Sequence, residues 1–199
     1  PSSLYVGLRT ERMFVEQDEP LPVEIIVTDL DGKAIAGVEV KLTMARLEWT
    51  WQGDGYQEKE VKPQPCTVKS EVAPVSCTFE TPEGGTYRIS ATVMDAEGRA
   101  NLTQLTRWVS GGDRIPSREV EQEEITLVPD KKEHQPGETA EILVQAPFYP
   151  AEGILTLRRS GLVSSERFTL EGPSTTLRIP IEEGYTPNVT VQVDLVGAA

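Results

Sequence analysis

The chain has 199 residues, with 32 acidic and 19 basic side chains and a formal net charge of −13 at pH 7. This charge argues against sequence-independent nucleic-acid binding, which needs lysines and arginines to neutralise phosphates, and it disfavours adsorption to anionic lipid. No apolar run is long enough to form a transmembrane helix, and no signal peptide is recognisable. Because the chain starts at Pro1 without a methionine, we expect an internal piece of a longer protein.

The composition predicts strands joined by turns rather than helices. Sixteen glycines and fifteen prolines separate short runs rich in valine, isoleucine and threonine, which is the composition of β-structure with frequent turns. The first half predicts about seven strands at turn spacings near ten residues, at positions 4–8, 13–15, 23–29, 38–44, 77–79, 86–93 and 102–109. That spacing is typical of an immunoglobulin-like sandwich.

An aromatic hairpin is predicted around Gly53-Asp54-Gly55, with Trp49, Trp51 and Tyr56 on its flanks. We weigh two interpretations of these rings. They either cap one end of the sandwich core, since tryptophan is highly buried on average, or form an exposed contact surface for a carbohydrate or a protein partner.

The strand pattern lapses at residues 111–123, which we interpret as a linker between two domains. The linker contains Arg114 and Arg118, whose exposure would make them a protease-sensitive point, although an ordinary connector is the simpler interpretation. The predicted domains are therefore 1–110 and 124–199, joined by 111–123.

The second half repeats features of the first. Six strands are predicted, at 125–128, 140–145, 154–158, 166–170, 175–179 and 189–196. The stretch Glu141-Ile142-Leu143-Val144 matches Glu24-Ile25-Ile26-Val27 at an offset of 117 residues, which indicates two copies of one module. The second copy holds one strand fewer, so its last strand is expected beyond Ala199. The predicted fold class is all-β, with two tandem immunoglobulin-like or fibronectin-III-like antiparallel sandwiches.

The two cysteines, Cys66 and Cys77, lie eleven positions apart, a spacing that fits two adjacent antiparallel strands. With a single histidine in the chain they cannot complete a four-ligand zinc site, which leaves a disulfide or two free thiols. An oxidising compartment would favour the disulfide.

We find no pattern that indicates catalysis. The only histidine, His134, is predicted in an exposed turn, and no Gly-x-Ser-x-Gly elbow accompanies it. Acidic pairs such as Glu182-Glu183 arise by chance on an acidic protein, and the segment 29–32 lacks the ligand series of an EF-hand. No phosphate-binding glycine loop is present. We therefore expect no enzyme activity, no cofactor, no metal site and no small-molecule substrate.

The second module contains five stretches that carry a family resemblance: 128–132, 135–148, 155–161, 179–183 and 187–189. Through them it resembles the macroglobulin-like domain that precedes the bait-bearing region of bacterial alpha-2-macroglobulins. The first module resembles the preceding macroglobulin-like domain through 14–27, 31–32 with 37–38, and 85–89. Both resemblances imply macroglobulin-like β-sandwich domains.

The resemblance implies a broad-spectrum protease inhibitor that traps proteases after its bait is cut, in many members with a covalent thioester formed from a Cys-x-Glu-Gln motif. Cys66 is followed by Thr67-Val68-Lys69 and Cys77 by Thr78-Phe79-Glu80, so neither cysteine matches that motif. We therefore expect a scaffold segment, whose partners are proteases, through the full-length parent, and neighbouring domains of the same chain. The implied location of the parent is the periplasm or cell envelope, with an inner-membrane lipoprotein anchor as one form.

The competing interpretation comes from a different class of protein. It is a pair of immunoglobulin-like modules from a surface adhesin or carbohydrate-binding protein, with Trp49, Trp51 and Tyr56 as the contact surface. The exposure of these three rings distinguishes the two interpretations.

Overall fold

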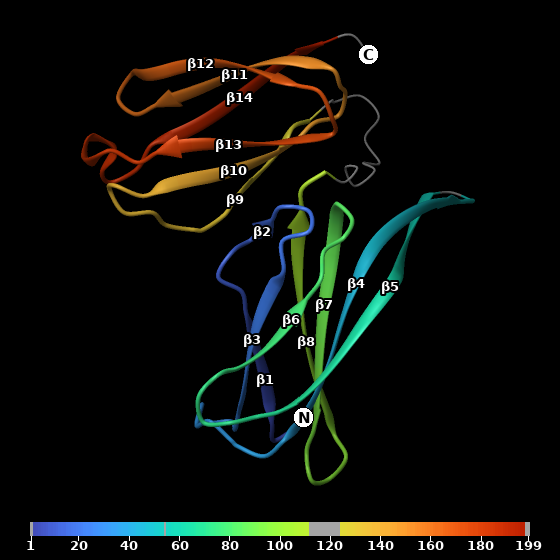
Figure 1. The fold of residues 1–199 in the computed structure, drawn as a ribbon. Coiled ribbons are helices and arrows are strands. Elements are labelled where there is room, and N and C mark those ends of the chain that lie inside the picture. Colours follow the sequence, from blue (N-terminus) through green and yellow to red (C-terminus); the bar gives the residue numbers. More distant parts are fainter. Residues whose placement is uncertain (1, 54, 112–123, 198–199) are drawn as a thin grey trace. The chain divides into compact units, whose positions relative to one another are not determined.

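The computed structural model describes residues 2–53, 55–111 and 124–197, which form strands and one short 3-10 helix (Figure 1). The predicted all-β fold is confirmed. The chain divides into two compact units, Pro1–Val109 and Ser110–Ala199, and each is described here by itself. The described part of the chain holds no helix long and apolar enough to cross a membrane.

The first unit is built from two sheets. One is three-stranded and antiparallel, in the order β1 (Tyr5–Arg9), β3 (Leu21–Thr28) and β6 (Val75–Phe79). The other has the order β2 (Phe14–Val15), β8 (Ala100–Val109), β7 (Gly85–Met94), β4 (Glu39–Gln52) and β5 (Gly55–Lys69), in which only the β2–β8 pair is parallel.

The core of the first unit lies between these sheets, because alternate side chains of each strand point inward. In β3 the buried positions are Leu21, Val23, Ile25 and Val27, and they share one apolar cluster with alternate residues of β4 and β7. Burying each such aliphatic side chain stabilises the fold by about 1.5–3 kcal/mol. The alternation of apolar residues in the sequence of these strands therefore identifies the side chains that form this core.

Side chains of β8 join the two sheets along one edge. Asn101 Oδ1 accepts a hydrogen bond from the Val6 amide at 3.0 Å, and the Thr103 hydroxyl donates to the Val6 carbonyl oxygen at 2.6 Å. The two side chains satisfy both backbone groups of Val6, as a neighbouring strand would. They therefore cover part of the outer edge of β1, which would otherwise present unpaired backbone groups.

The second unit also contains two three-stranded antiparallel sheets. Their orders are β13 (Ser174–Pro180), β10 (Thr139–Gln145), β9 (Thr126–Pro129) and β12 (Leu162–Leu170), β11 (Ala151–Arg158), β14 (Thr190–Gly197), and the 3-10 helix is Glu183–Tyr185. Buried side chains such as Ala140, Ile142, Leu155 and Ile179 form its apolar core. Each of the six strands predicted in this half overlaps an observed one.

The strand orders of the two units correspond. The sheet β1–β3–β6 matches β9–β10–β13, and the segment β7–β4–β5 matches β14–β11–β12. The two segments aligned at an offset of 117 residues lie in β3 and β10, the middle strands of equivalent sheets. β2 and β8 have no counterpart among the described residues of the second unit.

Candidate functional site

The predicted aromatic hairpin exists and extends past the sheet that supports it. β4 pairs with β7 only from Val40 to Leu47, whereas its pairing with β5 continues to Gln52 opposite Gly55. We call residues 48–52 with 55–59 the hairpin tip. In Figure 1 the β4–β5 ribbon reaches beyond β7. Among the described residues, no third strand pairs with the hairpin tip.

The three predicted contact residues lie in or next to this hairpin tip. Trp51 is the cross-strand partner of Tyr56, and Trp49 is the partner of Glu58. Trp49 is half-buried. The side chains of Trp51 and Tyr56 lie outside what the structure describes, so the choice between a core cap and a contact surface stays a prediction.

The base of the hairpin tip is fixed to the sheet by Arg88 of β7. The guanidinium lies 2.5 Å from Glu58 and 3.3 Å from Glu60, both on β5, while β4 runs between β7 and β5. Ala45 is the β4 residue opposite Arg88 and is fully buried, so its small side chain leaves room for the arginine to pass. The hydrogen bond to Glu58 raises the pKa of Arg88, which keeps the cation charged.

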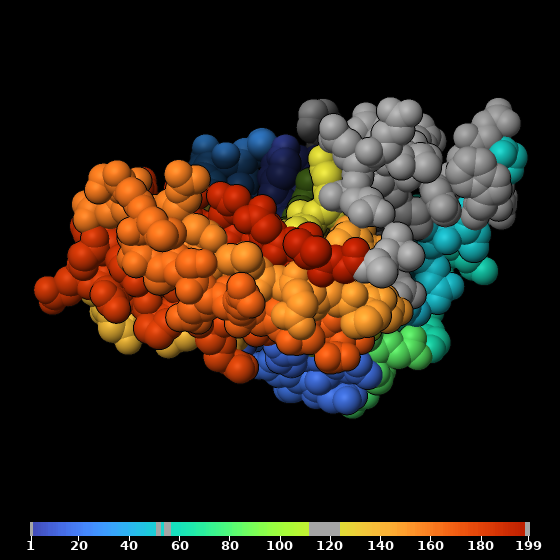
Figure 2. Space-filling view, turned by 90° about the horizontal axis from the view of Figure 1, so that it is seen from above, coloured from blue at the N-terminus to red at the C-terminus, as the bar shows by residue number. Residues whose placement is uncertain are grey.

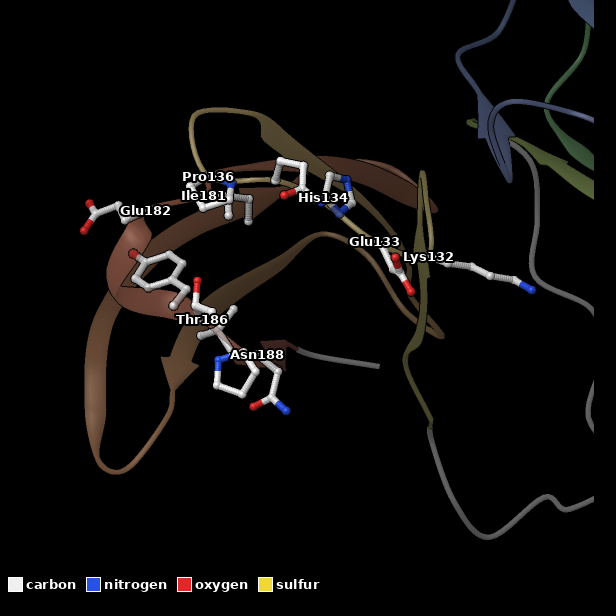
Figure 3. A pocket seen from close by; sticks show the side chains of 12 residues that line it. Lys132, Glu133, His134, Pro136, Ile181, Glu182, Thr186 and Asn188 are labelled. Atoms are coloured by element: carbon white, nitrogen blue, oxygen red, sulfur yellow. The ribbon is translucent and has the colours of Figure 1, made fainter.

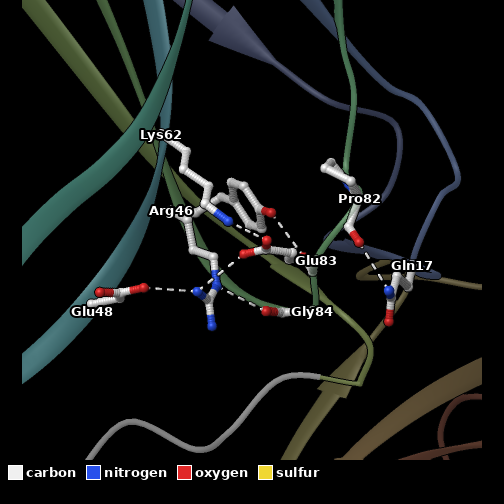
Figure 4. Close-up of polar contacts among 8 residues, drawn as sticks. Gln17, Arg46, Glu48, Lys62, Pro82, Glu83 and Gly84 are labelled. Atoms are coloured by element: carbon white, nitrogen blue, oxygen red, sulfur yellow. Dashed lines mark hydrogen bonds and ion pairs between the residues drawn. The ribbon is translucent and has the colours of Figure 1, made fainter.

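A second ionic cluster surrounds Glu83 in the loop between β6 and β7 (Figure 4). The Glu83 carboxylate is paired with the Lys62 ammonium and lies 3.3 Å from the guanidinium of Arg46, which also binds Glu48 at 2.9 Å. The hydrogen bond from Lys62 lowers the pKa of Glu83 below its usual range. Every charge in the cluster has an opposite partner, so the cluster can brace the loop but offers no free acid or base.

Backbone geometry sets the position of this cluster. The pairing of β4 with β5 shifts between Met44 and Arg46, and Lys62 takes a positive φ of 50° at that bulge. Gly85 has a φ of +138°, and a Cβ there would lie 3.0 Å from Arg46 Nε, so only glycine leaves the arginine its place. No sequence pattern predicts this cluster, because its members come from three segments and share no motif.

The predicted disulfide between Cys66 and Cys77 is present, with the two Cα atoms 6.5 Å apart. The predicted geometry around it was wrong. Cys66 lies on β5 and Cys77 on β6, and these strands belong to different sheets, so the bond joins the two layers of the sandwich instead of two neighbours in one sheet. The disulfide therefore joins the two sheets of the first unit at one edge, and the Asn101–Val6 contact joins them at the opposite edge.

His134 differs from its predicted role as an exposed loop residue. Its Nε2 lies 2.9 Å from Asp130 Oδ1, the two side chains are only 11% and 6% exposed, and the same Asp130 oxygen accepts the Glu141 amide at 3.0 Å. In the sequence, the spacing of four residues between Asp130 and His134 is the feature that could have predicted this contact. The pair anchors the loop between β9 and β10.

A pocket of about 510 Å³ lies beside His134 in the second unit (Figure 3). Figure 3 shows Lys132, Glu133 and His134 of the β9–β10 loop around this pocket, with Thr186 and Asn188 across from His134 and Ile181 next to Pro136. Its lining includes Pro136, Tyr185 and Asn188, and its only hydroxyls belong to Tyr185 and Thr186. With the imidazole nitrogen Nε2 engaged by Asp130, the lining suits contact with a ligand better than nucleophilic chemistry.

Arg114 and Arg118 lie outside the described residues. The Asp29 carboxylate accepts the amides of Asp31 and Lys33 at 3.0 and 2.9 Å, so it serves the turn. In the ranges that the structure describes, no group of three or more His, Cys, Asp or Glu side chains could hold a metal ion.

Residues 125–198 match the family model described as the alpha-2-macroglobulin bait region domain. A curated relative, the alpha-2-macroglobulin homolog of Nostoc sp., is 28% identical over 206 residues, covering 98% of this chain and 11% of the relative. The resemblance to the alpha-2-macroglobulin family is thereby confirmed. The chain spans about a tenth of the length of this curated relative.

Solved alpha-2-macroglobulins also resemble the chain. The native conformation of the Escherichia coli protein is 18% identical with a TM-score of 0.39, covering 97% of this chain and 15% of that one. The methylamine-reacted Salmonella protein is 17% identical with a TM-score of 0.40, over the same shares.

The family match refines the position of the second unit. The sequence resemblance predicts both modules before the bait-bearing region, whereas the model that matches residues 125–198 is that of the bait region domain. Residues 125–198 of the second unit therefore resemble the part of alpha-2-macroglobulins that this model describes.

Proposed function

We propose that this chain is a scaffold segment of a bacterial alpha-2-macroglobulin-like, broad-spectrum protease inhibitor, which holds proteases after they cut its bait. The match of the second unit to the bait region domain carries the proposal. In this role the segment is inhibitory rather than catalytic, and its partners are proteases, met through the full-length parent, and neighbouring domains of the same chain.

The links between the two sheets of the first unit support a scaffold role. Its two layers are joined by the Cys66–Cys77 bond on one edge and by hydrogen bonds from Asn101 and Thr103 to Val6 on the other. Cross-links at both edges oppose separation of the sheets, because each limits the open states that the layers can reach. A unit of this kind can hold neighbouring domains in place while a bait is being cut.

The disulfide also supports a location in an oxidising compartment. Disulfides persist in the periplasm and in secreted proteins and are rare in the cytosol. We therefore place the parent in the periplasm or cell envelope, with an inner-membrane lipoprotein anchor as one form. Detection of the Cys66–Cys77 bond in protein isolated from cells, with thiols blocked at lysis, tests this placement.

Retention of a protease by the full-length parent tests the proposed function. The parent is mixed with each of several unrelated proteases, and the fraction of protease that co-elutes with it in size-exclusion chromatography is measured. The matched control is the same protease with its active site blocked by an inhibitor specific to its class. The proposal expects retention of active proteases only; equal elution of active and blocked proteases as free enzymes would contradict it.

A second candidate function rests on the hairpin tip. The tip extends past β7 and contains Trp49, which is half-buried, and the cross-strand pair of Trp51 and Tyr56. Aromatic side chains on a projecting hairpin suit a carbohydrate or protein contact of an adhesin. A glycan array probed with the chain and with a Trp51→Ala variant distinguishes this candidate, since clear signals lost in the variant would favour it over the scaffold.

A further inference from the structure

The pocket between the β9–β10 loop and the segment that follows β13 is a preformed cavity of the second unit. Its two walls are tied together by backbone hydrogen bonds. The Gly137 amide donates to the Ile181 carbonyl oxygen, and the Ile181 amide donates to the Glu138 carbonyl oxygen, both at 2.8 Å. The Arg159 guanidinium donates to the Gly184 carbonyl oxygen and so ties the 3-10 helix to the β11–β12 turn. The volume of about 510 Å³ lies in the range of ligand sites, which are usually largely formed before a ligand binds.

Both walls of the pocket lie at the surface, and their polar groups are available. Figures 1 and 2 show the β9–β10 loop, in gold, and the segment that follows β13, in orange-red, at one end of the second unit. Most polar side chains of the lining have no hydrogen bond or ion pair with another described residue; they are Glu133, Gln135, Glu182, Tyr185, Thr186 and Asn188. The acids around Arg46 and Lys62, by contrast, are all paired. The lining can therefore bind a ligand without breaking contacts of its own.

His134 presents an acceptor once its contact with Asp130 is taken into account. Its Nε2 lies 2.9 Å from Asp130 Oδ1, and the same oxygen accepts the Glu141 amide. A carboxylate oxygen accepts hydrogen bonds, so Nε2 carries the hydrogen of this contact and Nδ1 of the neutral ring has a free lone pair. Among the described residues Nδ1 has no partner.

Glu133 gives the pocket a negative charge that has no ion pair among the described residues. Figure 3 shows Lys132, the neighbouring cation, extending away from Thr186 and Asn188. The Thr186 hydroxyl and the Asn188 amide oxygen add further acceptors. A ligand with a positive charge and several N–H donors satisfies this set, and the net charge of −13 on the chain favours the approach of a cation.

The pocket also has an apolar side. Ile181 lies next to Pro136 in Figure 3, and Tyr185 adds an aromatic ring. Lysine and arginine pack their methylene stems on apolar surface while their charged heads stay in polar surroundings. A cation is also attracted to the face of an aromatic ring. An apolar wall beside an unpaired carboxylate therefore matches a basic side chain better than a sugar, whose hydroxyls carry no charge.

We propose that this pocket binds an arginine or lysine side chain of a partner polypeptide. The methylene stem lies along Pro136, Ile181 and Tyr185, and the charged head donates hydrogen bonds to Glu133 and Asn188. Because the ionic contact is exposed, added salt weakens it. The site belongs to the second unit alone and does not depend on whether the parent retains proteases.

Titration of the 199-residue chain with a short peptide, followed by two-dimensional ¹H–¹⁵N NMR, tests the proposal. The probe is a Gly-Arg-Gly peptide that is acetylated and amidated, so that the arginine carries its only charge. It should shift the backbone amides within 132–138 and 181–189 and reach saturation. The matched probe contains citrulline, which has the shape of arginine without the charge, and should bind about two- to fivefold more weakly.

Two substitutions locate the site, and each has a matched control. Glu133→Gln removes the negative charge and should weaken arginine binding about two- to fivefold, the usual effect of an exposed ion pair, whereas Glu171→Gln in the loop after β12 should not. Asn188→Lys places a cation in the pocket and should weaken binding by about tenfold or more, whereas Ser165→Lys on exposed β12 should have a much smaller effect. None of these four side chains makes a contact with another described residue, so each variant should fold.

The outcomes that would overturn the proposal are distinct. They are equal affinity for the arginine and citrulline peptides, shifts centred outside the two lining segments, or no saturable shift at all. Equal loss of binding in the two control variants would show a general attraction to an acidic surface and would also overturn it. Maltose, titrated in the same way, serves as the neutral comparison. Saturable shifts of the lining amides with maltose and none with the arginine peptide would assign the pocket to a carbohydrate instead.

Discussion

Gln64 and Glu80 exchange two hydrogen bonds across the gap between the two sheets of the first unit. The Gln64 Nε2 donates to the Glu80 carbonyl oxygen at 2.7 Å, and the Glu80 amide donates to Gln64 Oε1 at 3.1 Å. The Gln64 side-chain amide therefore binds both backbone groups of Glu80, as the backbone of a neighbouring strand would. It lies two residues from Cys66, so a hydrogen-bonded link and a covalent link close the same edge.

Replacing Gln64 by alanine should destabilise the first unit by about 1 kcal/mol, since two partly exposed hydrogen bonds are lost together. All three tryptophans, Trp49, Trp51 and Trp108, belong to this unit, so urea unfolding followed by tryptophan fluorescence reports on it selectively. Gln57→Ala, the same change at an exposed position of β5, is the control and should have little effect. Equal stability of the two variants would show that the Gln64 contact contributes nothing.

Removing the disulfide should lower the unfolding free energy of the first unit by more than Gln64→Ala does. A Cys66→Ala/Cys77→Ala double variant opens a loop of about a dozen residues, for which the chain-entropy account gives about 2–3 kcal/mol. Cys77 is buried in the core, and alanine adds no polar group there. The same fluorescence-detected urea unfolding measures the loss. A change of less than 0.5 kcal/mol, taken as roughly the effect of an ordinary surface substitution, would mean that the two layers are held mainly by other contacts.

Asp95 should make the first unit sensitive to acid. Its carboxylate accepts hydrogen bonds from the amide and hydroxyl of Ser3, from the amides of Glu97 and Arg99 and from the Arg99 side chain. The Ser3 amide first, and then the Arg99 and Glu97 contacts, lower the pKa of Asp95 well below its usual range. A lowered folded-state pKa adds stability that is present above the unfolded pKa of about 4 and is lost as the pH falls below it.

Asp95→Asn tests this expectation by comparison with the unsubstituted 199-residue chain. The difference in unfolding free energy between the two should be largest near neutral pH and should shrink steadily below about pH 4. Asp31→Asn, in an exposed turn, is the control and should give a small difference at both ends of the range. A difference for Asp95→Asn that stays constant with pH would show that the carboxylate is not held in its charged form.

The second unit should not tolerate a side chain at Gly153. A Cβ there would lie 2.2 Å from Cζ of Phe168, the cross-strand partner on β12, whereas a Cβ at Gly161 meets no atom within 4 Å. Gly153→Ala should therefore lower the stability of this unit by about 1–3 kcal/mol through overpacking, and Gly161→Ala should not. Differential scanning calorimetry resolves the two units. Adding Phe168→Leu to Gly153→Ala should recover part of the loss, and no recovery would place the cause elsewhere.

The sequence predicted the strands best where one face of a sheet is buried. The alternation in 23–27 and 86–93 and the turn at Asp31-Gly32 correspond directly to observed elements. β5 was not predicted as a strand, because its outer half is rich in Glu, Lys and Gln and its pairing contains a bulge. The length of β4 was missed for the same reason, since the bulge changes which positions face the core.

The contacts that join distant segments could not be predicted from one sequence. The two cysteines indicated a bond, but period and spacing do not tell whether two consecutive strands share a sheet. The hydrogen bonds of Gln64 and Asn101 replace strand pairing with side-chain amides, and no local pattern marks such residues. His134 appeared exposed because its partner Asp130 and the loop around them have no regular periodicity.

The position of the first cut in the full-length parent tests the scaffold account most directly. The parent is exposed briefly to several unrelated proteases, and the earliest cleavage sites of the molecules that retain a protease are mapped by mass spectrometry. The account predicts early cuts outside this 199-residue segment, with both units left intact. Early cuts at Arg114 or Arg118, or within either unit, in molecules that retain the protease would contradict it, because the segment itself would then serve as bait.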